Sequence, residues 1–171
     1  CGAQVFYVDH HFAGKVPASA SLKSLVNQAP DVCTSVLINH YLRGAYKEWA
    51  IVGCFGDNLS VTAQGMLKNL NLSSDKVALL EKLGTYINYN GYGSDINELH
   101  FTPDALYRLL SPYKSPFDFI ADNRENYQQL EAGYLQDMQA ASATEPLKAT
   151  ATTAVFVLPD EPWARRVSGV Y

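Results

Sequence analysis

The stretch Val5-Phe6-Tyr7-Val8-Asp9-His10-His11 is a short apolar run that ends in three ionisable side chains. Its first four residues are β-branched or aromatic, a pattern that predicts a buried β-strand. In open α/β sheets, ligands lie beyond the carboxyl ends of the strands, where Asp9, His10 and His11 would follow. One carboxylate and two imidazoles on so short a piece of chain suit Mn, Zn or Fe better than Ca. The stretch therefore predicts a divalent-metal site at a strand end.

Two later segments extend this pattern. Pro30-Asp31-Val32-Cys33-Thr34-Ser35 places small and hydroxyl residues where a helix is expected to begin, and Val52-Gly53-Cys54-Phe55-Gly56-Asp57-Asn58 ends an apolar run in an aspartate. Together with the Asp-His-His triplet, these segments resemble the DHH phosphoesterases. That family includes RecJ-type exonucleases, oligoribonucleotide and cyclic-dinucleotide hydrolases and Mn-dependent pyrophosphatases. The resemblance covers roughly residues 3–60 and continues more weakly to about residue 140.

The resemblance implies an α/β fold. Residues 1–140 would form the helix-rich part of a doubly wound parallel-sheet DHH domain with its connecting helices. Residues 141–153, rich in Ala, Thr and Ser, would form a linker. Residues 154–171 would hold the first strand and the start of a truncated second domain.

The resemblance also implies roles for individual residues. His10 and Asp57 would be metal ligands, and His11 would contact the substrate phosphate as a donor. Asp9 would act beside His11 in catalysis by orienting an imidazole, a role that metal-bound histidines usually require. Thr34 and Ser35 are candidates for substrate binding at a helix N-terminus, although ordinary helix capping and packing explains them equally well.

The implied activity is hydrolysis of phosphodiester or phosphoanhydride bonds by two-metal activation of water. The cofactor would be a divalent metal, Mn first and Mg or Co next. The substrate would be a small phosphoester such as a short oligonucleotide, a nucleotide or polyphosphate. The alternatives are a degenerate relative that only binds a nucleotide or a protein, and a single-metal site without chemistry.

One part of the family pattern is absent. The family carries an Asp-x-Asp pair and a lone aspartate before its Asp-His-His strand, but only eight residues precede Asp9 and the chain contains no Asp-x-Asp. The chain also begins with Cys1 rather than Met. We therefore expect a fragment that lacks half of the metal site and is inactive by itself.

Composition narrows the partners further. The chain is 47% apolar and 18% charged, which is typical of globular domains, and its net charge is −4. Scattered Lys and Arg residues disfavour binding of long nucleic acid, which needs a clustered basic face. No apolar run reaches the roughly 20 residues of a membrane-spanning helix. Cys33 and Cys54 lie in apolar segments as expected of buried reduced thiols, which favours a cytoplasmic location.

The remaining pattern predicts mostly helices. A loop at 12–30 includes a helical turn near Leu22–Val26, and a helix at 31–43 is capped by Asp31 and ended by Gly44. Further helices are expected at 48–55, where a strand is the alternative, and at 62–70 and 74–88. Others follow Thr102 and Ser115, the last of them long. A strand at 154–158 precedes another element from Trp163 to Val170.

Several side chains have two interpretations. Tyr86, Tyr89 and Tyr92 could stack a nucleobase, but a packing role at a helix end is the commoner one. His40 and His100 have no partners at ligand spacing and are expected to be structural. Arg165 and Arg166 are expected on a solvated helix face, with substrate contact as the alternative.

Overall fold

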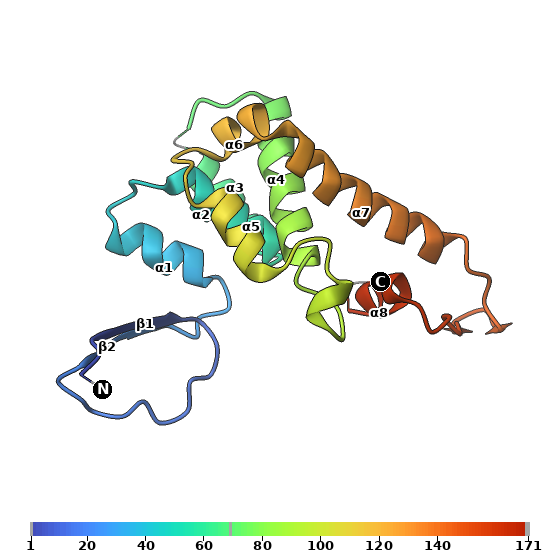
Figure 1. Ribbon diagram of the computed structural model, residues 1–171, viewed down its shortest axis with the longest axis horizontal. Coiled ribbons are helices and arrows are strands. Elements are labelled where there is room, and N and C mark those ends of the chain that lie inside the picture. The colour runs from blue at the N-terminus through green and yellow to red at the C-terminus, as the bar shows by residue number, and fades with distance from the viewer. Residues whose placement is uncertain (1, 69, 170–171) are drawn as a thin grey trace. The chain divides into compact units, whose positions relative to one another are not determined.

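The computed structural model describes residues 2–68 and 70–169 and divides the chain into two compact units, Cys1–Thr85 and Tyr86–Tyr171. Figure 1 shows a mixed α/β chain in which helices predominate. The elements are β1 (Val5–Asp9), β2 (Leu22–Val26), α1 (Thr34–Tyr41), α2 (Lys47–Gly56), α3 (Ser60–Leu67), α4 (Ser74–Tyr89), η1 (Ile96–Glu98), α5 (Pro103–Leu110), α6 (Pro116–Asp122), α7 (Arg124–Ser142), β3 (Lys148–Ala149), β4 (Ala154–Val155) and α8 (Pro162–Val167).

The first unit begins with a two-stranded parallel sheet (Figure 1). β1 pairs with β2 in a register that sets Val5 opposite Leu22 and Asp9 opposite Val26. The helical turn predicted near Leu22–Val26 is therefore wrong. Its apolar residues are ambiguous at this length, and pairing with β1 decides for a strand.

The structure corrects a second expectation, that β1 is buried. Val5 is 50% exposed and Phe6 is 40% exposed, while Tyr7 to Asp9 are only partly covered. Helix α1 contacts β1, and the Phe6 ring lies 4.8 Å from the Tyr41 ring, centroid to centroid. Within the described residues the sheet has only two strands, too few to cover both faces of β1.

Helices α1 to α4 supply the core of the first unit. Ile51, Cys54, Leu80 and Leu83 are fully buried. Helices α2 and α4 approach closely at Gly84, where an added Cβ would lie 2.3 Å from the Val52 carbonyl oxygen. The helix expected at 48–55, where the pattern also allowed a strand, is α2, and the helix predicted at 74–88 is confirmed as α4. The helix predicted at 62–70 corresponds to α3, and residue 69 of that prediction lies outside the described residues.

The start of α1 differs from the prediction. Its N-cap is Cys33, with no side-chain cap, rather than Asp31. Its end is as predicted, because Gly44 has a φ of +83° and its amide donates to the Asn39 carbonyl. Gly44 follows Arg43, which has a φ of 54°. Left-handed residues of this kind are common where helices end.

The second unit holds α5 to α8 and a short hairpin. Thr102 and Ser115 precede α5 and α6 as predicted, each followed by proline at the first helical position. The single long helix expected after Ser115 is instead broken at Asn123, whose backbone leaves the helical region. The segment expected as a linker contributes the end of α7 and the strand β3.

The end of the second unit also departs from the pattern. The strand predicted at 154–158 is reduced to β4, which pairs antiparallel with β3. Helix α8 packs against α7 and buries Val167. Cys1 and the predicted element's last residue, Val170, lie outside the described residues. Among the described helices, none combines the length and apolar character that crossing a membrane requires.

Candidate metal centre

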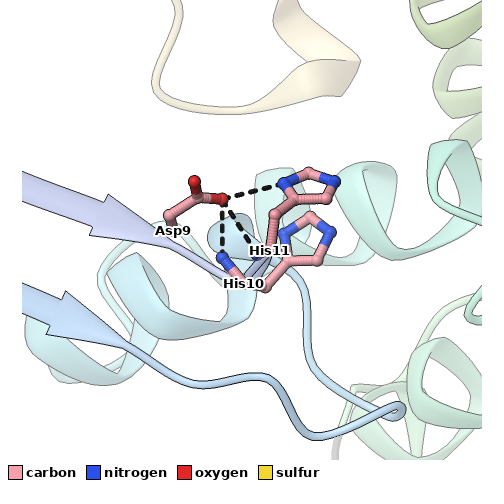
Figure 2. A group of neighbouring side chains, drawn as sticks. All are labelled: Asp9, His10 and His11. Carbon is pink, nitrogen blue, oxygen red and sulfur yellow. Dashed lines mark hydrogen bonds and ion pairs between the residues drawn. The ribbon is translucent and has the colours of Figure 1, made fainter. Parts of the chain in front are cut away.

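Asp9 closes β1 and organises the turn that follows it (Figure 2). Its Oδ1 accepts the backbone amides of His10 at 2.7 Å and of His11 at 3.1 Å, as well as the His11 ring Nδ1–H at 2.9 Å. Its Oδ2 accepts the Tyr7 hydroxyl at 2.6 Å. The Tyr7 hydroxyl and the His11 donors hold the pKa of Asp9 well below its usual value. Asp9 is thus an ionised carboxylate whose two oxygens are already occupied.

His10 lies between two elements that follow it in the chain. Its Nδ1 accepts the Thr34 amide at 3.1 Å, at the first residue of α1, and lies 3.0 Å from Thr34 Oγ1. Its Nε2 lies 3.2 Å from Oδ2 of Asp57, the C-cap residue that follows α2. The structure therefore brings together the two residues expected as metal ligands.

The distance between these two donors fits a shared cation. Two ligands about 2.1 Å from one ion and about 90° apart have donor atoms roughly 3.0 Å apart, close to the observed 3.2 Å. His10 is 20% exposed and Asp57 is 40% exposed, so a hydrated ion can reach both. A divalent ion needs at least four ligands, so this pair fits an ion as part of a larger donor set.

Thr34 offers a donor and an acceptor to Nδ1 of His10, one for each position that the proton of a neutral ring can take. While its amide donates to Nδ1, the proton of a neutral ring sits on Nε2 and faces Asp57. A metal at Nε2 requires that proton to move to Nδ1, where the Thr34 hydroxyl oxygen is placed to accept it. Thr34 is thus positioned to orient the ligand in either state.

One of the two ring nitrogens of His11, Nδ1, is engaged by Asp9. Its Nδ1–H donates to Asp9, its ring is 73% exposed, and its centroid lies 4.0 Å from that of His10. The carboxylate of Asp9 therefore orients His11 rather than the His10 ring. Nε2 is the atom left to meet a ligand, and it donates to a phosphate only when the ring is doubly protonated.

A second grouping of donors is available at the same turn. Asp9, His10 and His11 each offer a ligand atom, and these atoms lie within 4.8 Å of one another. We favour the His10–Asp57 pair as the cation site, because both oxygens of Asp9 are used by Tyr7, His11 and the turn. Asp9 then stabilises the arrangement of the ligands.

Ser35, Cys33 and Cys54 lie in the packing between the start of α1 and α2. An added Cβ on Gly53 would lie 2.2 Å from Ser35 Oγ, so Ser35 is packed against α2. Cys33 and Cys54 are buried and free, as predicted, with their sulfur atoms 3.9 Å apart. Their hydrogen bond and burial raise the pKa of Cys54.

Some residues of the site and of the core were not singled out by sequence reasoning. Tyr7 has a detectable signal, since residues two apart on a strand share a face and Tyr7 therefore lies beside Asp9. Of the three tyrosines considered for stacking, Tyr86 and Tyr89 are 4% and 2% exposed, which leaves no ring face of theirs for a base. Tyr92 is partly exposed and packs against the core cluster of Tyr89, Ala141 and Val167.

The two arginines of α8 differ in their surroundings, and only Arg165 keeps a partly exposed side chain, 31% exposed. Arg166 is buried and paired with Asp137, and Arg165 binds Glu98 and Asp160. Their sequence spacing carries no sign of these distant partners.

Neither the family models, nor the curated proteins, nor the solved structures contain a match to this chain.

Proposed function

We propose that the protein is a metal-dependent phosphoesterase of the DHH type, which hydrolyses phosphodiester or phosphoanhydride bonds in a small substrate. The observation that carries the proposal is the 3.2 Å approach of His10 Nε2 to Asp57 Oδ2. His10 directly follows β1 and Asp57 directly follows α2, so two candidate metal ligands from separate parts of the chain lie close together. Manganese is the expected ion, with magnesium or cobalt as substitutes.

The residues around this pair have distinct tasks. A divalent cation, when bound, activates water and neutralises charge on the phosphoryl group. His10 and Asp57 would hold it, and Thr34 would keep the His10 ring oriented through Nδ1. Asp9 fixes the turn and the Nδ1 proton of His11, so that the exposed Nε2 of a doubly protonated His11 ring would donate to a phosphate.

The partly exposed sheet supports a larger domain around the site. Parallel strands are normally covered on both faces, because crossover helices lie over them. The exposed Val5 and Phe6 are therefore what two strands of a larger doubly wound sheet would show. The same larger domain would supply the further carboxylates that two divalent ions require.

Metal analysis of the full-length gene product, combined with a substrate panel, tests the proposal. The panel contains pyrophosphate, a short RNA and a cyclic dinucleotide. We expect bound Mn and product release from at least one substrate, both lost on chelation. Asp57→Asn should weaken metal binding at least tenfold because it removes a ligand charge, an effect at least as large as losing a residue that only hydrogen-bonds to a ligand, which costs about 10–100-fold.

Asp31→Asn is the matched control, because Asp31 is exposed and lies before α1. It should leave metal binding and turnover unchanged. Metal binding without turnover on any substrate would favour the non-catalytic alternative. Absence of metal at millimolar Mn would refute the site itself.

A further inference from the structure

Two buried thiols lie near the candidate metal centre, within the first unit. The sulfur atoms of Cys33 and Cys54 are 3.9 Å apart and share a hydrogen bond, and both cysteines are free. A single buried cysteine is ordinarily a small apolar side chain. Two that face each other across a helix contact can also be joined, because a disulfide bond requires only a closer approach of the same two atoms.

The packing of α1 against α2 makes the two thiols neighbours. Cys33 precedes α1 and Cys54 lies within α2. The residues next to them in the chain are in close contact, since an added Cβ on Gly53 would lie 2.2 Å from Ser35 Oγ. Gly53 therefore allows the approach of the two helices at the position of the cysteine pair.

Cys33 is the member of the pair that an oxidant can reach. It is the N-cap of α1, where no side chain caps the helix. Helix ends open locally more readily than cores do. Cys33, which is 3% exposed, therefore becomes accessible when the first turn of α1 opens, whereas Cys54 stays fully buried.

The start of α1 also favours the reactive form of Cys33. Thiolates are stabilised at helix N-termini. The Cys54 thiol and then the amides of Val36 and Ser35 lower the pKa of Cys33, against the opposing effect of burial. Cys33 is thus the nucleophile of the pair, and Cys54 is placed to react with its oxidised form.

A peroxide is the oxidant that this pair suits, and two steps complete the reaction. The Cys33 thiolate attacks one oxygen of hydrogen peroxide, the O–O bond breaks, and Cys33 sulfenic acid and hydroxide form, the hydroxide taking up a proton to become water. The Cys54 sulfur then attacks the sulfenic sulfur, so that the S–S bond forms, the S–O bond breaks and water leaves with the Cys54 proton. The two thiols together lose two electrons and two protons, and the peroxide is reduced to two molecules of water.

Forming this bond would disturb the metal centre. A disulfide bond is about 2.05 Å long, so the two sulfur atoms must approach by about 1.9 Å. Cys54 is held within α2, whereas Cys33 lies at a helix end, so Cys33 makes most of the movement. The next residue, Thr34, holds Nδ1 of His10 through its amide at 3.1 Å and its hydroxyl at 3.0 Å. Movement of Cys33 therefore displaces the residue that orients a metal ligand.

We propose that Cys33 and Cys54 are an oxidative modification site, at which a peroxide forms a disulfide between the start of α1 and α2 and thereby weakens metal binding at His10. The control of metal binding rests on the proposed function, whereas the disulfide itself does not. A small-molecule thiol reverses the modification by exchange and restores the metal site.

Peptide mapping of the full-length gene product after treatment with hydrogen peroxide tests the modification. Digestion without reductant should give two peptides linked through Cys33 and Cys54, which dithiothreitol separates. In Cys54→Ala the linked peptides should be absent and Cys33 should be recovered as sulfinic or sulfonic acid, because no thiol captures the sulfenic acid. Absence of the linked peptides from the native protein at excess peroxide would overturn the site.

Calorimetric titration with Mn tests the link to the metal centre. The oxidised protein should bind Mn about tenfold more weakly than the reduced protein, as when a residue that hydrogen-bonds to a metal ligand is lost. Cys33→Ser is the matched control, since serine is a favoured N-cap and cannot form the disulfide, and its Mn affinity should resist peroxide. Equal losses in the native protein and in Cys33→Ser, or full Mn affinity of the disulfide-linked protein, would overturn the control of metal binding.

These outcomes are separate from those that test the proposed function. Linked peptides in a protein that binds no Mn even when reduced would refute the metal centre and retain the disulfide site. Turnover with bound Mn, together with no linked peptides, would do the reverse.

Discussion

His10→Ala is expected to abolish turnover of the full-length protein and to lower its metal affinity by more than about 100-fold. Loss of a residue that only hydrogen-bonds to a metal ligand costs about 10–100-fold in metal affinity, and His10 is placed to be a ligand itself. Alanine removes both the ring nitrogen that faces Asp57 and the acceptor of the Thr34 amide. Metal affinity is measured by calorimetric titration with Mn, and turnover by product release.

The matched control for this variant is His40→Ala. His40 is an exposed histidine of α1, in the same unit, so its loss changes composition in the same way without touching the site. It should retain both metal affinity and turnover. Unchanged turnover in His10→Ala would remove His10 from the site, and equal losses in the two variants would point to a general folding defect.

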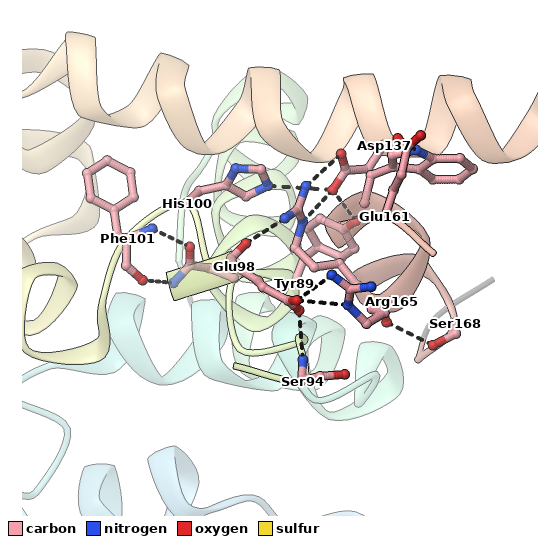
Figure 3. Close-up of polar contacts among 12 residues, drawn as sticks. Tyr89, Ser94, Glu98, His100, Phe101, Asp137, Glu161, Arg165 and Ser168 are labelled. Atoms are coloured by element: carbon pink, nitrogen blue, oxygen red, sulfur yellow. Dashed lines mark hydrogen bonds and ion pairs between the residues drawn. The ribbon is translucent and has the colours of Figure 1, made fainter. Parts of the chain in front are cut away.

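Arg166→Met is expected to destabilise the second unit by about 3 kcal/mol, the lower end of the range for breaking a buried ion pair. Arg166 Nε and Nη2 donate to Asp137 at 2.7 Å and 3.0 Å, and both side chains are at most 9% exposed. Tyr89 also donates to Asp137, at 2.6 Å (Figure 3). Methionine would leave the buried carboxylate with Tyr89 as its one remaining donor among these contacts.

His100 is a poor substitute for the lost cation. Its Nε2 lies 3.6 Å from Asp137 Oδ2, which is too long for a hydrogen bond, and this buried nitrogen has no hydrogen-bond partner among the described residues. Burial and the charge of Arg166 lower the pKa of His100 in the native protein. We therefore expect His100 to restore little of the stability that Arg166 provides.

The effect of Arg166→Met should depend on pH in a defined direction. Burial raises the pKa of Asp137, but Arg166 and Tyr89 outweigh it and hold that pKa below its ordinary value of 3.8. The pair therefore stabilises the native protein above pH 3.8, and this contribution is lost as pH falls through the native pKa. Without Arg166, burial dominates and the pKa rises, so the difference in stability between variant and native protein should shrink on acidification.

Urea denaturation measures this change, with Trp163 as the reporter. Trp163 packs against the core cluster of Tyr89, Ala141 and Val167, and a Trp49→Phe background leaves it as the only indole. Arg108→Met removes an exposed ion pair and should have little effect. The double variant Asp137→Leu/Arg166→Met should recover much of the loss, because it leaves no unpaired charge. A loss in Arg166→Met no larger than in Arg108→Met would contradict the role of the pair.

The sequence was most informative where local pattern decides structure. The apolar run that ends at Asp9 is a strand, as its pattern predicts. The pattern before Asp57 allowed a helix or a strand, and the helix that the resemblance favoured is the one observed. The approach of His10 and Asp57 to 3.2 Å depends on how β1, α1 and α2 pack, which the resemblance implied and local pattern alone could not.

Other features depend on partners distant in sequence. Leu22–Val26 is a strand because β1 lies beside it, and five residues with an ambiguous pattern carry no such information. Arg166 is buried because Asp137 lies on the adjacent helix, although a pair of adjacent arginines ordinarily indicates a solvated face. Cys33 and Cys54 were expected to be buried, but their separation of 21 residues gives no sign that their sulfur atoms face each other.

Crystals of the protein grown with Mn, examined by anomalous scattering, test most directly whether His10 and Asp57 share a cation. The account predicts a peak within about 2.3 Å of both His10 Nε2 and Asp57 Oδ2, a distance typical of metal–ligand bonds. A peak held by Asp9 and His11 with Asp57 turned away, or no peak near His10 at saturating Mn, would contradict it.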